Sequence, residues 1–185
     1  ALIELVERCR QFSSNFEEII SQKVQELTKG QYVKYLVDNL GLPEIYGLFW
    51  QLSNKYHRNI NLAEIRAVIN PRGNTAEFKN AVGEETMRKI AERYGLQLIK
   101  GLDEKVHQMF NNPMRTELLI RSMEENLLRH FISILEHDLK QGMKLLIIAD
   151  HGYDIECKRE MCRLCHGTEC KKQKLSLIIP LIIIY

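Results

Sequence analysis

The tripeptide Asp150-His151-Gly152 has the clearest potential for chemistry in this chain, because it follows the apolar run from Lys144 to Ala149. A carboxylate and an imidazole at the buried end of a strand cost desolvation free energy unless a partner compensates for it, and metal coordination is one such compensation. Gly152 lets the backbone turn close to such a site. We therefore expect a functional site at this strand end, and we ask which other polar residues stand in equivalent positions.

Polar residues of suitable chemistry also lie beside the other predicted strands. In open parallel sheets, ligands bind beyond the carboxyl ends of the strands, so residues that follow different strands meet at one edge. Carboxylates and imidazoles are ligands that zinc, manganese and similar divalent ions prefer. The candidate metal ligands, in chain order, are Asp38, Thr75, Asp103, His107, Asp150, His151 and His166.

Thr75 has a position that favours reaction with a phosphate ester. It stands at the predicted start of a helix, where free backbone N–H groups and the helix dipole hold an anion. A hydroxyl at this point can attack phosphorus, and Arg72 adds a phosphate contact.

Asp103 and His107 are four residues apart, which places both side chains on one face of a helix. Each of these patterns also arises in ordinary structure: an aspartate after a strand, such as Asp38, often only forms a turn.

The elements that must position these residues alternate between helix and strand. Hydrophobic periodicity and end signals predict helices over 2–28, 44–56, 74–94 and 114–140, and strands over 32–37, 60–69, 96–99, 144–149 and 175–185. Asn74 is the expected N-cap of the third helix, with Glu77 completing a capping box, and Gly95 its expected end. This pattern predicts an α/β fold with a mostly parallel sheet flanked by helices. We expect an N-terminal helix over 1–30 and an α/β domain over 31–185, with a Cys-rich loop over 157–170.

Composition excludes several classes of protein. The 185 residues carry a net charge of only +2, which gives no bulk attraction to nucleic acid. No signal peptide is visible, and the apolar run 175–185 is too short to span a membrane, so we expect neither membrane association nor export. The chain begins without Met and stops inside this run, so we expect a fragment or a trimmed domain. Five cysteines, an odd number, argue against a disulfide framework and favour the cytoplasm.

The order of these residues resembles that of the alkaline phosphatase superfamily. The segment Leu139 to Gly152 resembles the helix, strand and metal-ligand turn of cofactor-independent phosphoglycerate mutases. Val37-Asp38-Asn39-Leu40-Gly41 resembles the first strand and its metal aspartate, and Leu177 to Ile183 resembles the strand after the last metal histidine. The compact layout over 32–185 is most similar to PglZ-type domains.

This resemblance implies a two-metal phosphoester hydrolase, either a phosphatase or a phosphodiesterase, with an alkaline-phosphatase-like core. One zinc or manganese ion would bind Asp103, His107 and His166, and a second would bind Asp38, Thr75, Asp150 and His151. Thr75 would be the nucleophile and form a covalent phosphothreonine. His166 departs from the family pattern, because it lies in Cys162-x2-Cys165-His166-Gly167 rather than in a His-Thr context.

The cysteines support a second kind of site. Cys157, Cys162, Cys165 and Cys170 fall within 14 residues, a density that suits a structural zinc or an iron–sulfur cluster. The string Cys162-Arg163-Leu164-Cys165-His166 also matches the c-type haem attachment motif, which the lack of an export signal disfavours.

Two further functions remain open. Asp150, Glu156 and Lys158 resemble the metal-binding carboxylates and the lysine of restriction-type magnesium endonucleases, and a basic tail would then meet DNA phosphates. The spacing between Asp150 and Glu156 is tight for that arrangement. The basic residues of that tail, which otherwise form a solvated loop, are Lys158, Arg159, Arg163, Lys171, Lys172 and Lys174. A non-enzymatic helical interaction module with a four-cysteine zinc tip is the other alternative.

Overall fold

The computed structural model of the chain describes residues 16–55, 63–171 and 175–185. The expected N-terminal helix is present as α2 (Phe16–Thr28). The expected helical residues 2–15, the first residues of the expected strand 60–69, and the basic residues Lys172 and Lys174 lie outside the described residues.

The described elements alternate as an α/β chain does. The remaining helices are α3 (Leu42–Asn54), α4 (Thr75–Val82), α5 (Met87–Tyr94), α6 (Leu102–Asn111), α7 (Thr116–Ser122) and α8 (Arg129–Lys140), with a π-helical turn η3 (Met123–Leu128) and a 3-10 turn η4 (Gly167–Glu169). The strands are β1 (Val33–Val37), β2 (Ala63–Ile69), β3 (Gln97–Ile99), β4 (Met114–Arg115), β5 (Leu145–Ala149), β6 (Asp154–Lys158), β7 (Met161–Cys165) and β8 (Ile178–Ile184).

The main sheet has five strands in the order β2-β8-β5-β1-β3, and it is mixed rather than mostly parallel. The pairs β1–β3 and β1–β5 are parallel, whereas β8 is antiparallel to both of its neighbours, β5 and β2. The expectation of a mostly parallel sheet is therefore wrong, because β8 is antiparallel. The described residues between β5 and β8 form a hairpin and a 3-10 turn instead of a crossover helix, so the chain returns antiparallel.

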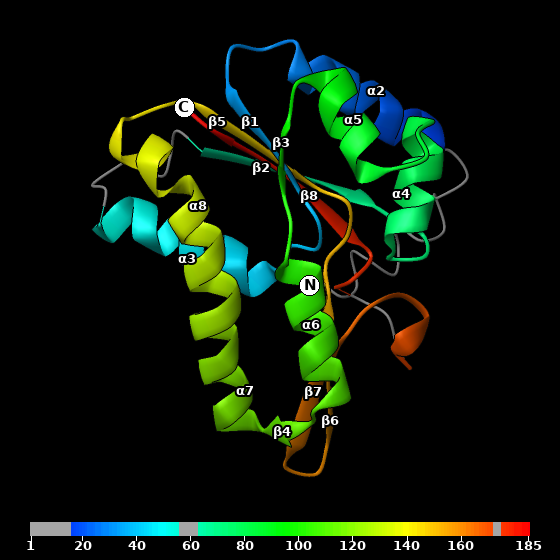
Figure 1. Cartoon of the computed structure of the whole chain (residues 1–185), viewed down its shortest axis with the longest axis vertical. Helices are drawn as coiled ribbons and strands as arrows, with labels where there is room; N and C mark the ends of the chain where they lie inside the picture. Colours follow the sequence, from blue (N-terminus) through cyan, green and yellow to red (C-terminus); the bar gives the residue numbers. More distant parts are fainter. Residues whose placement is uncertain (1–15, 56–62, 172–174) are drawn as a thin grey trace.

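Helices cover both faces of this sheet (Figure 1). Helices α2, α4 and α5 lie on one face, and α3, α6 and the α7–α8 helix lie towards the other. Successive residues of β5 alternate between the two apolar cores: Leu145, Ile147 and Ala149 belong to one, and Leu146 and Ile148 to the other. This alternation is the period-2 pattern of a strand buried on both sides, and it explains why the run is continuously apolar.

The single helix expected over 74–94 is two helices in the structure. Asn74 caps α4 as expected, with its Oδ1 accepting from the backbone N–H of Glu77 at 2.9 Å. However, Gly83 adopts a left-handed conformation (φ 77°) and ends α4, and Thr86 caps α5 through the backbone N–H of Lys89. Glycine has no Cβ to oppose this conformation, so a helix ends there at low cost.

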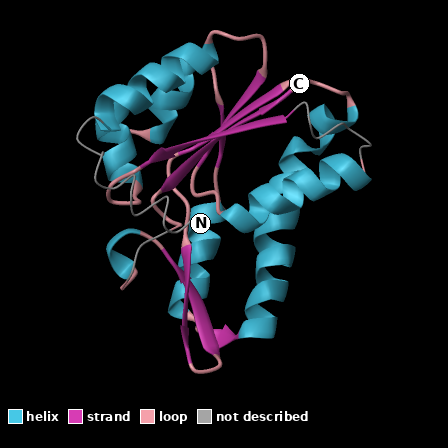
Figure 2. Cartoon of the chain, turned by 180° about the vertical axis from the view of Figure 1, so that it is seen from behind, coloured by secondary structure: helices cyan, strands magenta, loops and turns pink. Residues whose placement is uncertain are grey.

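The helix expected over 114–140 is continuous from Thr116 to Lys140, but one turn of it, η3, is π-helical. Its expected first residues instead form the short strand β4, which pairs with β7. The expected Cys-rich loop contains the antiparallel hairpin β6–β7. Together with β4, this hairpin forms a small second sheet that projects from the main sheet beside α6 and α7 (Figure 2).

The strand ends line up at one edge of the main sheet. Val37 pairs with both Ile99 and Ala149, so β1, β3 and β5 end at the same level. Ile69 at the end of β2 pairs with Ile178 at the start of β8. The residues that follow β1, β2, β3 and β5 therefore meet in one place, as do those that precede β8.

Candidate two-metal centre

Asp103, His107 and His166 form the first of two ligand groups at this edge. Asp103 and His107 are one turn apart on α6, and His166 directly follows β7. The Nε2 atom of His166 lies 3.0 Å from Oδ1 of Asp103 and 3.3 Å from Nε2 of His107, and Nε2 of His107 lies 3.4 Å from Oδ2 of Asp103. Two imidazole nitrogens this close need a proton or a cation between them, so the three side chains present the donor set of a divalent metal.

Asp38, Asp150 and His151 form the second group, in which one ligand atom from each residue lies within 4.8 Å of the others. Asp150 and His151 are fully buried. Oδ1 of Asp150 accepts from the backbone N–H groups of Asn39 (3.0 Å) and His151 (2.9 Å), whereas Oδ2 has no hydrogen-bond partner in the described part of the chain. A buried carboxylate oxygen without a donor is costly, and a cation at this point would compensate for it.

Thr75 extends the second group. Its Oγ1 lies 3.2 Å from Nε2 of His151, while Nδ1 of the same ring lies 2.9 Å from the carbonyl of Gly152. A carbonyl only accepts, so the neutral ring carries its proton on Nδ1 and directs the lone pair of Nε2 towards Thr75. The Thr75 hydroxyl and the imidazole of His151 thus face the same point.

The two groups are electrostatically connected. Burial, followed by the charges of Asp150 and Asp103, raises the pKa of Asp38 to about 7. Burial also acts to raise the pKa of Asp103, but hydrogen bonds from His166 and Asn39 outweigh it and lower that pKa to about 2. The rings of His151 and His166, one from each group, lie 4.5 Å apart between centroids. Asp38, Asp103 and Asp150 place three carboxyl groups at this edge, and this concentration of acidic groups suits bound cations.

All seven residues that the sequence suggested as ligands thus lie at one edge of the sheet. Arg72 precedes the Thr75 turn, and its side chain is largely exposed. It makes an ion pair with Oε2 of Glu77, a residue of α4, at 3.3 Å. A phosphate contact by Arg72 stays a prediction.

Three residues that sequence reasoning overlooked support the ligands. Asn39, buried with φ 68°, donates from Nδ2 to Oδ1 of Asp103 at 3.1 Å. Asn70, fully buried, donates from Nδ2 to the carbonyls of Asn74 (2.8 Å) and Asp150 (3.1 Å), which ties the Thr75 turn to β5. Glu169 places Oε1 3.2 Å from Nδ1 of His107. The Asp-Asn pair at the end of β1 was a usable signal for Asn39, because asparagine tolerates left-handed backbone.

A buried carboxylate supports the turn behind the site. Glu44 of α3 accepts from the hydroxyl of Tyr153 at 2.8 Å and from the backbone N–H of Gly41 at 3.0 Å. Burial raises the pKa of Glu44 to about 7, although these hydrogen bonds act in the opposite direction. Gly41 lies in the turn after β1, and Tyr153 lies in the turn after β5. The two hydrogen bonds of Glu44 therefore hold these turns together.

The four cysteines in the described part of the chain are paired, contrary to the expectation that an odd number of cysteines argues against disulfides. Cys157 bonds to Cys162 across the hairpin, and Cys165 bonds to Cys170. The four sulfurs are consumed in two separate bonds and do not form one four-thiolate centre. A four-cysteine zinc site, an iron–sulfur cluster and haem attachment all require free thiols, so none of them forms while both disulfides are intact, and a four-cysteine zinc site stays a prediction.

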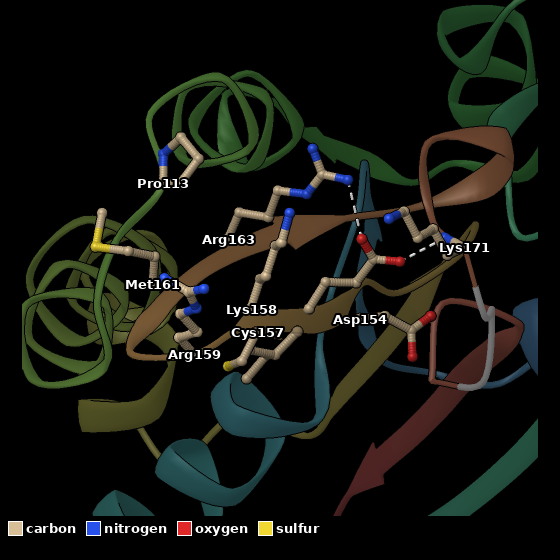
Figure 3. Close-up of a pocket in the computed structure, with 10 residues that line it drawn as sticks. Pro113, Asp154, Cys157, Lys158, Arg159, Met161, Arg163 and Lys171 are labelled. Carbon is tan, nitrogen blue, oxygen red and sulfur yellow. Dashed lines mark hydrogen bonds and ion pairs between the residues drawn. The ribbon is translucent and has the colours of Figure 1, made fainter.

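The residues suggested for a nuclease do not gather around one point. Asp150 groups with Asp38 and His151, whereas the carboxylate of Glu156 is held by Arg163 and by the backbone N–H of Lys171, as the dashed lines in Figure 3 show. Lys158 lines the pocket beside the hairpin together with Arg159 and Arg163. Asp150 and Glu156 therefore belong to separate clusters in this fold.

No family model, curated protein or solved structure gives a significant match to this chain. Among the described residues, no helix combines the length and the apolar character that crossing a membrane requires.

Proposed function

We propose that this chain is a two-metal phosphoester hydrolase of the alkaline phosphatase superfamily, most similar to PglZ-type domains, with Thr75 as its nucleophile. The observation that carries the proposal is the convergence of two three-residue ligand groups, with the Thr75 hydroxyl 3.2 Å from the imidazole of the second. Residues from five separate parts of the chain meet there, which is more than a chance pair of acidic residues provides.

The residues present fit two divalent cations. Asp103, His107 and His166 would hold one, and Asp38, Thr75, Asp150 and His151 the other. Oδ2 of Asp150 accepts no hydrogen bond in the described part of the chain and lies 3.5 Å from Nε2 of His151, and the pKa of Asp38 is raised. Both are features of a site that lacks positive charge. Bound there, zinc or manganese would supply Lewis-acid activation of a hydroxyl and neutralisation of phosphate oxygens.

The chain itself contributes orientation and the nucleophile. Thr75 is the first residue of α4, and the side chain of Asn74 occupies the backbone N–H of Glu77, so the hydroxyl is held at a rigid helix start. Oγ of Thr75 attacks phosphorus, the bond from phosphorus to the leaving oxygen breaks, and a phosphothreonine forms. Water then attacks the same phosphorus, releases phosphate or a phosphomonoester, and restores Thr75. The burial of Asp150 and His151 strengthens the electrostatic interactions that act on the transferred group.

The test is hydrolysis of p-nitrophenyl phosphate and of bis-(p-nitrophenyl) phosphate with Zn²⁺ or Mn²⁺. We expect Thr75→Ala to lower kcat by at least about 10³-fold and Thr75→Ser to retain much of it, because serine preserves the hydroxyl. The matched control is Lys158→Ala, which should leave the rate unchanged. Full activity in Thr75→Ala would eliminate the nucleophile assignment. Loss of activity and of plasmid cleavage in Lys158→Ala alone would favour the nuclease.

A further inference from the structure

Cys165 and Cys170 enclose a four-residue loop that contacts several parts of the candidate centre. His166 contacts Asp103, and Glu169 contacts His107. The backbone of Gly167, with φ 54°, lies so close to the Thr75 turn that an added Cβ would stand 3.5 Å from Cβ of Asn74 and from the carbonyl of Gly73. A covalent link between Cys165 and Cys170 therefore fixes both ends of a loop on which the geometry of the centre depends.

The two sulfurs of this link lie beside a carboxylate. One carboxylate oxygen of Glu156 and the Sγ atoms of Cys165 and Cys170 all lie within 4.8 Å of one another. Both cysteines are buried, and Glu156 is held in place by Arg163 at 2.9 Å and by the backbone N–H of Lys171. Two thiolates and a carboxylate form a donor set typical of zinc.

The strand register separates this cluster from the other two cysteines. Glu156 pairs with Arg163 across the hairpin, and Cys165 lies two residues beyond Arg163 on β7, so Glu156 and Cys165 share one face. Cys162 lies three residues from Cys165 and points to the opposite face, where it pairs with Cys157. The hairpin therefore brings only one pair of cysteines to the carboxylate.

We propose that Glu156, Cys165 and Cys170 form a third metal site, which binds zinc when the Cys165–Cys170 disulfide is reduced. A dithiol reductant transfers two electrons to the disulfide, becomes a cyclic disulfide itself, and leaves two protein thiols. Zinc binding then releases the two thiol protons and forms two zinc–sulfur bonds. The carboxylate of Asp154 lies 4.0 Å from Sγ of Cys170, but it already accepts from Leu175 and Ser176, so the protein supplies three ligands.

This site gives the loop a crosslink under both redox conditions. Loss of the disulfide alone frees the ends of the loop, and closing it again costs conformational entropy. Zinc held by the same two sulfurs restores the closure, so His166 and Glu169 keep their places in a reducing as well as an oxidising environment. The proposal concerns a site outside the hydrolytic centre and does not depend on the proposed hydrolase function.

Cobalt(II) is a suitable probe, because thiolate ligands give it an intense near-ultraviolet charge-transfer band that imidazole and carboxylate ligands do not. We expect this band in the full chain reduced with a phosphine, and its loss in the oxidised chain. Cys165→Ser and Cys170→Ser each leave one thiolate at the site and should each weaken the band, and Glu156→Gln should weaken cobalt binding. The matched control is the double variant Cys157→Ser/Cys162→Ser, which should retain the band.

Two results would overturn the proposal: no band in the reduced wild-type chain, or loss of the band in Cys157→Ser/Cys162→Ser. The wild-type and control measurements decide the matter even if a substitution at the buried Cys165 impairs folding, which far-ultraviolet circular dichroism would reveal. Phosphoesterase activity does not enter either readout, so failure of the third site and failure of the hydrolase function are distinguishable.

Discussion

Asn39 joins the two ligand groups, because its side-chain Nδ2 donates to Oδ1 of Asp103 at 3.1 Å while its backbone N–H donates to Oδ1 of Asp150 at 3.0 Å. The first carboxylate belongs to one group and the second to the other. Its left-handed backbone, with φ 68°, is what directs both donors inwards. Asn39 thus fixes the orientation of two carboxylates that would otherwise repel each other.

The variant Asn39→Gly separates these two roles. Glycine adopts the same backbone conformation and keeps the N–H donor to Asp150, but it loses the side-chain bond to Asp103. We expect the affinity for Mn²⁺ to fall by about 10- to 100-fold, the usual effect of removing a residue that orients a ligand. Titration against a competing chelator measures this change. Manganese is the probe because it prefers oxygen ligands to the thiolates of the cysteines. Asn112→Gly, on an exposed asparagine that donates to the carbonyl of Gln108 one turn earlier, is the control. Equal affinities in the two variants would mean that Asn39 has no role in orienting Asp103.

Glu169→Gln tests the support of the other histidine. Oε1 of Glu169 lies 3.2 Å from Nδ1 of His107, while Nε2 of the same ring faces Asp103 and His166. A neutral amide is a weaker acceptor, so we expect Mn²⁺ affinity at the first group to fall by about tenfold or more. Glu160→Gln at the exposed hairpin turn should bind manganese like the wild-type chain. If Glu169→Gln and Glu160→Gln bind equally well, the carboxylate does not orient His107.

The sequence revealed the ligands better than it revealed the residues that support them. Asp150 and His151 were visible because two polar residues directly follow a continuously apolar strand, and the ends of the other strands then indicated where their partners lie. Asn39, Asn70 and Glu169 act through contacts with residues distant in the chain, which local patterns do not encode. Their roles therefore required the structure.

The errors in the predicted fold have local causes. The turn of the hairpin β6–β7 contains Arg159 at φ 56° instead of the Gly or Asn that marks most tight turns, so the segment resembled a loop. Gly83 was treated as an interior helix residue, although Thr86 behind it provided a new N-cap. The direction of β8 followed from the missing crossover helix, a signal that was present in the sequence and was not used.

Tyr153→Phe tests the clamp behind the Asp150 turn. The substitution removes the hydroxyl that donates to both carboxylate oxygens of the buried Glu44, whose pKa burial already raises to about 7. We expect the free energy of unfolding at about pH 8, where Glu44 is ionised, to fall by about 1.5–3 kcal/mol. Urea denaturation measures this change. The control is Tyr46→Phe, at an exposed tyrosine of α3, the helix that also carries Glu44. In a Glu44→Gln background, Tyr153→Phe should lower the free energy of unfolding by less than it does in the wild-type chain. If the two substitutions lower it by amounts that simply add, the clamp is contradicted.

The raised pKa of Asp38 predicts how metal binding and stability depend on pH. Burial, with help from the charges of Asp150 and Asp103, raises this pKa from 3.8 to about 7. Between pH 3.8 and about 7, Asp38 of the folded metal-free chain therefore keeps a proton that the same residue has released in the unfolded chain. The stability this provides is complete below pH 3.8 and is lost as the pH rises through about 7. Asp38 should thus contribute a falling free energy of unfolding over this window, with a slope of at most about 1.4 kcal/mol per pH unit.

A cation reverses this trend, because it binds the ionised carboxylate and displaces the proton. The contribution of Asp38 should make Mn²⁺ affinity rise with pH up to about 7 and then level off. Below that pH, Mn²⁺ binding should release a proton, which calorimetry in buffers of different ionisation enthalpy detects. Asp38→Asn removes the proton and should lose both the pH-dependent term in stability and that proton release. Asp138→Asn, at a carboxylate that accepts from the Tyr35 hydroxyl and belongs to neither ligand group, is the control. Proton release in Asp38→Asn equal to that of the wild-type chain would show that Asp38 does not meet the metal.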